Sequence, residues 1–169
     1  LILFVILTAG NISVYRMIFA PEALKVSVLE VGKKESVVLV RSQNNASILI
    51  DTGPDASILR ALGRELPPWQ RSIDTIVLTN ATPSSAGGLP EVLSRYRVSN
   101  LIRFGPPGSK SIETALREAT SAEIGLRQIP ITQSQRIALG DNTYIDIIMS
   151  STGVTNVYLS KRGVVTQLK

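Results

Sequence analysis

The stretch "VLTNATPSSAGGLPEVL", residues 77–93, decides how the rest of the chain is interpreted. It begins as an apolar strand, passes through a short polar loop and a Gly-Gly pair, and continues with the pattern of a helix. A loop at the end of a buried strand is a common place for metal ligands in hydrolases. Here the polar side chains of the loop are amide and hydroxyl groups, from Asn80, Thr82, Ser84 and Ser85.

Composition restricts the chemistry that the chain can perform. Its 169 residues suit one domain with a proper core, and they include no histidine and no cysteine. Zinc sites nearly always use these two residue types, so we expect no conventional zinc site; Cys–His and Ser–His–Asp nucleophiles are excluded. Oxygen-only sites for magnesium, calcium or manganese stay open. We expect no cofactor.

The charge balance is basic, with 18 Lys+Arg against 13 Asp+Glu and a net charge of +5. Such a surplus favours contact with phosphates or anionic lipid head groups. The basic residues are scattered, however, and no basic run interleaved with aromatic residues is present. We therefore expect any binding of single-stranded DNA to be weak, sensitive to salt and indifferent to sequence.

The first twenty residues, "LILFVILTAGNISVYRMIFA", are mostly apolar and carry one charge, on Arg16. A helix that spans a bilayer needs about 20 such residues. We expect residues 1–21 to be the end of a transmembrane helix that Pro21 terminates, followed by a separate domain at 22–169. A signal-peptide core and a buried helix of the soluble domain are the alternatives.

After Pro21 the pattern alternates between strands and helices. Apolar β-branched runs predict strands at 24–31, 36–41, 47–51, 73–79 and 98–104. Helical periodicity predicts helices at 55–66, 88–96 and 111–120, the first with Asp55 as its N-cap. The last third reads as further strands, with hairpin turns at 139–143 and 160–163. The fold class expected is α/β, as an α+β sandwich.

Four segments in order carry a resemblance to a known family. They are "VSVLEVGKKESVVLV", "ILIDTGPD", "LGRELPPWQRSIDTIVLT" and "AGGLPEVLSRYRVSNLI". From Leu24 to about Lys169 the chain resembles the metallo-β-lactamase-like C-terminal domain of ComEC, the DNA-uptake channel protein of naturally competent bacteria. The resemblance implies a metallo-β-lactamase-like αββα fold that follows a transmembrane bundle. It also implies a cell-membrane location, with the soluble domain on the extracytoplasmic side.

The chain departs from the family pattern where the metal would bind. Members that bind metal read T-H-x-H-x-D-H-x-G-G after the strand, whereas here Asn80, Thr82 and Ser85 stand at the histidine positions and Ser84 at the aspartate position. Hydroxyl and amide groups are poor ligands unless carboxylates help, and this loop has none. The family's later T-G-D is matched only by "VVTQLK" (164–169), so we expect a domain that is C-terminally incomplete and binds no metal.

One retained position and one pair of substituted positions have competing interpretations. The resemblance implies that Asp51 would hydrogen-bond the metal loop; we favour a strand-end aspartate that caps the turn through Thr52-Gly53. Lys33 and Lys34 replace Gln-Gly of the family's opening hairpin. They are candidates for DNA contact, although a charged hairpin tip is the commoner explanation.

Three further features are weighed in the same way. Trp69 is a candidate for stacking on a base, but a single Trp after Pro-Pro is more often a lid over a core edge. Gly87-Gly88 would let a helix pack tightly or approach a phosphate, and we favour tight packing against the strand. Glu30 and Glu35 are candidates for a hard cation, but two carboxylates without a third are more often solvated.

The function expected is that of a non-catalytic domain of a ComEC-type membrane protein, which takes part in DNA uptake by binding or positioning. Its expected partners are the cell membrane, single-stranded DNA and other segments of a transmembrane channel. Two alternatives stay open. One is a metal-dependent nuclease or phosphodiesterase with non-standard oxygen ligands. The other is a decayed fragment without function.

Overall fold

The computed structural model describes residues 24–32, 35–42, 46–140, 142–150 and 155–169. The expected membrane segment at 1–21 and the pair Lys33-Lys34 lie outside the described residues. Within the described ranges, no helix has the length and apolar character needed to cross a membrane. The membrane helix and the hairpin contact to DNA therefore stay predictions.

Two β-sheets form the body of the domain. The first has six strands in chain order, β1 Lys25–Val31, β2 Glu35–Arg41, β3 Ser47–Ile50, β4 Ser72–Leu78, β5 Arg97–Phe104 and β6 Arg127–Ile131. Its first three strands are antiparallel, and β3 to β6 are parallel. The second sheet is antiparallel, in the order β10 Val164–Gln167, β9 Thr155–Lys161, β8 Thr143–Met149 and β7 Gln135–Gly140.

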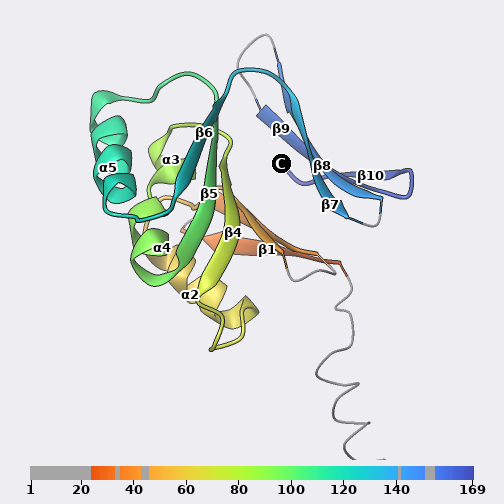
Figure 1. Cartoon of the computed structure of the whole chain (residues 1–169), viewed down its shortest axis with the longest axis horizontal. Coiled ribbons are helices and arrows are strands. Elements are labelled where there is room, and N and C mark those ends of the chain that lie inside the picture. Colours follow the sequence, from red (N-terminus) through yellow and green to blue (C-terminus); the bar gives the residue numbers. More distant parts are fainter. Residues whose placement is uncertain (1–23, 33–34, 43–45, 141, 151–154) are drawn as a thin grey trace, which may run out of the picture.

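Helices cover one face of the first sheet and the second sheet covers the other, so the described residues form three layers (Figure 1). The helices are α2 Ser57–Glu65, α3 Pro83–Ala86, α4 Leu89–Arg95 and α5 Lys110–Ser121. The short α3 lies in the stretch expected to be a loop. The helix expected at 55–66 begins later, at Ser57, although the Asp55 carboxylate still accepts a 2.8 Å hydrogen bond from the Ser57 N–H.

Alternation along the strands divides the core in two. In β2, Val37 and Leu39 belong to the cluster under the helices, whereas Val38 and Val40 belong to the cluster between the sheets. All four are buried. A strand that is apolar on both faces must be covered on both, which is why "SVVLV" and the fully buried "SILI" of β3 lie at the centre of the three layers.

The carboxyl ends of β3, β4 and β5 meet at one edge of the first sheet and place three loops there, 51–56, 79–82 and 105–109. Glycines allow these loops to touch. A Cβ on Gly87 or Gly88 would overlap backbone oxygens of Pro54 or Thr52, and a Cβ on Gly108 would overlap the Ala81 oxygen. The close packing expected at Gly87-Gly88 is confirmed, but the neighbour is the loop at 52–55 instead of a strand.

Candidate functional site

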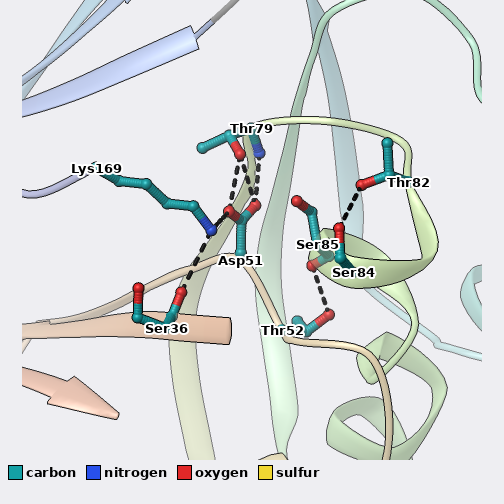
Figure 2. Close-up of polar contacts among 8 residues, drawn as sticks. All are labelled: Ser36, Asp51, Thr52, Thr79, Thr82, Ser84, Ser85 and Lys169. Carbon is teal, nitrogen blue, oxygen red and sulfur yellow. Dashed lines mark hydrogen bonds and ion pairs between the residues drawn. The ribbon is translucent and has the colours of Figure 1, made fainter. Parts of the chain in front are cut away.

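The polar loop after β4 turns directly into α3. Asn80 and Ser84 are half-buried, Thr82 is exposed and Ser85 is buried. The hydroxyls of Thr82 and Ser84 lie 3.1 Å apart and share a hydrogen bond. The backbone oxygen of Ser85 accepts hydrogen bonds from the Thr52 N–H at 2.7 Å and the Thr52 hydroxyl at 3.1 Å (Figure 2). The two contacts with Thr52 tie the polar loop to the loop that follows β3.

Asp51 is fully buried at the end of β3. Its Oδ1 accepts hydrogen bonds from the Thr79 N–H at 2.8 Å and the Thr79 hydroxyl at 3.0 Å, and its Oδ2 lies 2.8 Å from the same hydroxyl (Figure 2). The parallel register of Ile50 with Val77 brings the two strand ends side by side. The favoured interpretation, a cap on the Thr52-Gly53 turn, is therefore wrong: the carboxylate holds the first residue of the polar loop.

The backbone at Asp51 is itself unusual, with a φ of 62°. This left-handed conformation is costly for most side chains, and aspartate is among the few that adopt it. The turn redirects the chain out of the sheet while the carboxylate points back at β4. Its geometry therefore positions Asp51 to clamp the loop onto the sheet.

Lys169 completes the site from the other end of the described chain. Its Nζ lies 2.5 Å from Asp51 Oδ2 and 3.3 Å from the backbone oxygen of Ser36, to which it donates (Figure 2). The Lys169 oxygen accepts a 2.7 Å hydrogen bond from the Val157 N–H, which continues the β9–β10 pairing and fixes the backbone. The lysine side chain is 28% exposed, against 0% for the aspartate.

Sequence reasoning missed Lys169. The segment "VVTQLK" (164–169) is the nearest match to the family's T-G-D, and the sequence predicted no role for its last residue. The only signal was a cationic side chain two residues past β10, in the segment matched to the family's T-G-D. A pairing between Asp51 and a residue so distant in the chain depends on how the two sheets pack.

The residues present do not fit a metal ion. The loop offers one amide and several hydroxyls, and the nearby carboxylate of Asp51 already faces an ammonium group. A dication placed beside that ammonium would be repelled, and it would lack the anionic ligands that offset its desolvation. In the described ranges no three His, Cys, Asp or Glu residues come together. Glu30 is exposed on β1, and the side chain of Glu35 is outside the described residues.

Trp69 lies elsewhere, in the turn between α2 and β4, and its side chain is 82% exposed. The interpretation of Trp69 as a lid over a core edge is therefore wrong. It lines an open pocket of about 600 Å³ with Arg71, Ser72, Arg95 and Arg97. Sequence reasoning noted the tryptophan but not the arginines that gather around it.

Comparisons with known proteins identify the fold. No protein family profile and no curated protein matches the sequence. Zinc-bound PqqB from Methylobacterium extorquens is similar in structure, with a TM-score of 0.56 and 13% identity over 78% of this chain and 47% of that one. A mutant metallo-β-lactamase from Cronobacter sakazakii gives a TM-score of 0.52 and 22% identity, over 82% of this chain and 57% of that one.

A diphosphatase of the PhnP family gives a TM-score of 0.51 and 18% identity, over 75% of this chain and 49% of that one. The chain thus spans about half the length of each of these three proteins. At such identities the likeness concerns the fold and not the activity. The two facing sheets, the helices on one side and these neighbours together show that the described residues have a metallo-β-lactamase-like fold.

Proposed function

We propose that the chain is a non-catalytic metallo-β-lactamase-like domain of a ComEC-type membrane protein, and that it serves DNA uptake by binding or positioning. The resemblance in four ordered segments supports the ComEC-type assignment. The neighbouring structures support a domain derived from metallo-hydrolases. The cell membrane, with the domain on its extracytoplasmic side, and segments of a transmembrane channel are the proposed surroundings.

The ion pair between Lys169 and Asp51 carries the non-catalytic part of the proposal. Among the described residues, Asp51 is the only buried carboxylate, and a cation of the chain itself neutralises it beside the ligand-poor loop. Hydrolysis of a phosphodiester requires a water activated by a metal or a base. The loop provides hydroxyl and amide groups in the positions where those groups would be needed. A domain with this site keeps its fold and loses the reaction.

One set of samples tests two parts of the proposal, the lack of metal binding and the lack of DNA cleavage. The purified chain is dialysed against zinc and analysed for bound metal, and its unfolding is followed with zinc, manganese or EDTA. We expect no stoichiometric metal and no shift in Tm, because a ligand that binds the native state would raise it. The same samples should not degrade single-stranded DNA with magnesium or manganese. One bound ion per chain, or cleavage that EDTA stops, contradicts the proposal and favours a hydrolase with oxygen ligands; Asp51, Glu30 and Glu35 would then be mutated first.

A variant with restored loop ligands sharpens this test. The replacements Asn80→His, Thr82→His, Ser84→Asp and Ser85→His together should still give no cleavage. These changes do not supply the aspartate of the family's later T-G-D, and the ammonium of Lys169 stays beside the loop. Cleavage by this variant would show that the loop alone had been limiting.

A further inference from the structure

The pocket around Trp69 lies away from the degenerate loop. Trp69 and Arg71 precede β4, and Arg97 begins β5, so this pocket is at the amino ends of the parallel strands. The polar loop is at their carboxyl ends. The two sites therefore occupy opposite edges of the first sheet, and neither depends on the other.

The arginines are brought together by regular backbone pairing. The Arg97 N–H donates a 2.8 Å hydrogen bond to the Arg71 oxygen, and Ser72 pairs with Arg97 at the start of the β4–β5 ladder. Arg95 is the last residue of α4 and comes two positions before Arg97. Three cationic side chains from two segments thus converge on one pocket.

The tryptophan is presented by a short, restricted turn. Pro67 and Pro68 precede it, and their rings fix the backbone φ angle. The Gln70 N–H donates to the Pro67 oxygen at 2.9 Å, and the Gln70 side chain donates to the Ser72 oxygen at 3.1 Å. These contacts restrain the backbone that carries the indole, whose side chain is exposed to a ligand.

The arginines are available to a ligand. All three are exposed, and no described residue forms a hydrogen bond or an ion pair with any of the three guanidinium groups. No carboxylate lines the pocket. Three like charges in one hollow repel one another, and an anionic ligand relieves that repulsion.

We propose that the pocket formed by Trp69, Arg71, Arg95 and Arg97 binds single-stranded nucleic acid, with a base on the indole and backbone phosphates on the guanidinium groups. Stacking platforms next to cationic grooves bind single strands without sequence preference. A pocket of about 600 Å³ accommodates a nucleotide. The choice of DNA over RNA rests on the proposed function, whereas the site itself does not.

Two other occupants fit less well. A duplex has no free base face to stack on Trp69. A membrane surface requires apolar side chains that enter the lipid, and the only apolar side chain lining the pocket is that of Trp69. A single strand uses both features of the site, because its unpaired bases can stack on Trp69 while its phosphates contact the arginines.

The chain contains a single tryptophan, so its emission reports on this site alone. The full chain in neutral detergent is titrated with a 15-residue oligothymidylate at low salt. We expect quenching that saturates, and little with a duplex of equal charge or with vesicles containing phosphatidylglycerol. A vesicle response without an oligonucleotide response assigns the pocket to membranes and overturns the proposal.

Variants locate the binding, as measured by anisotropy of a labelled oligonucleotide. Trp69→Ala should weaken binding on the order of tenfold, and Trp69→Phe should recover most of it, because the ring still stacks. The triple variant R71Q/R95Q/R97Q should lower the slope of log K against log salt by about 2. The matched triple variant R60Q/R64Q/R117Q removes the same charge from exposed helix positions and should change the slope far less.

An equal decrease of the salt slope in the two triple variants, or an unchanged affinity in Trp69→Ala, would contradict the proposed binding site. The outcome is independent of the proposed function. A chain that quenches and also cleaves DNA overturns only the non-catalytic proposal. A chain that does not cleave DNA and shows no quenching overturns only this inference.

Discussion

At the scale of single residues, the site depends on one buried charge and its two partners. Asp51 receives the N–H and hydroxyl of Thr79 and the ammonium of Lys169, and it is fully buried. A carboxylate in such a place is costly unless it is paired and hydrogen-bonded. The pair therefore joins the end of β10 to the end of β3, and it holds the polar loop in place without a metal.

Replacing Lys169 should expose this dependence. Lys169→Met leaves Asp51 buried without its cation, and we expect a loss of about 2–4 kcal/mol in the free energy of unfolding, measured with urea. The double variant D51N/K169M should lose less than the sum of the two single losses, because the uncompensated charge is gone. Lys161→Met, at an unpaired lysine of β9, is the control and should change the stability by less than about 0.5 kcal/mol. Similar losses at both lysines would contradict the role of the ion pair.

At the scale of elements, the loop between β5 and α5 supports the polar loop from the side. Gly108 packs against Ala81, and its N–H donates a 2.8 Å hydrogen bond to Glu113 Oε1. Arg103, at the end of β5, reaches the same oxygen at 2.6 Å. One carboxylate from the first turn of α5 thereby joins a strand, a loop and a helix.

The ionisation of Glu113 makes this junction dependent on pH. The Gly108 N–H, and then Arg103, hold the pKa of the Glu113 carboxyl below its ordinary value of 4.5, against an opposing effect of burial. A depressed pKa in the folded state stabilises the protein above the ordinary pKa, and this stabilisation is lost as the pH falls through the folded value. Glu113→Gln should therefore cost about 1 kcal/mol near pH 7, and the difference from the unmodified protein should shrink below about pH 4.5.

Denaturant titrations at several pH values measure that difference. Glu118→Gln, on the same helix but with an exposed carboxylate, is the control. The free energy of unfolding of this control should differ little from that of the unmodified protein at any pH. A constant difference for Glu113→Gln from pH 7 to pH 3.5 would mean that shape, and not charge, explains the contact.

At the scale of the whole molecule, the first sheet separates two sites with different properties. One edge carries the neutralised aspartate and the polar loop, and the other carries Trp69 with three arginines. The order of the parallel strands fixes this separation, because every strand from β3 to β5 has its amino end at one edge and its carboxyl end at the other. A change at one of these edges can therefore leave the residues at the other edge in place.

The proposed location also belongs to the whole molecule. We expect the full chain to stay with membranes after a carbonate wash, because residues 1–21 are long and apolar enough to span a bilayer. A variant without these residues should move to the supernatant. Release of the full chain would contradict a spanning helix and leave the domain assignment unchanged.

The sequence by itself determined the order and type of most elements. Apolar alternation and helical spacing are local properties, so strands such as "SIDTIVL" and the helix after Gly88 were predictable within a few residues. Composition alone predicts that no conventional zinc site forms, since no packing can supply histidine or cysteine to a chain without them. The resemblance in motif order around Gly87-Gly88 predicted which loop positions correspond to the family's metal ligands.

Only the tertiary structure decided which side chains meet. Asp51 finds Thr79 because β3 and β4 lie in parallel register, and it finds Lys169 because the second sheet packs on the first. Trp69 is exposed, and Arg71 and Arg97 lie beside it, because two strands start at the same edge. The physical reason is the same in each case. Local periodicity selects the face on which a residue lies, whereas contacts between distant segments depend on sheet register and layer packing, which a single sequence does not display.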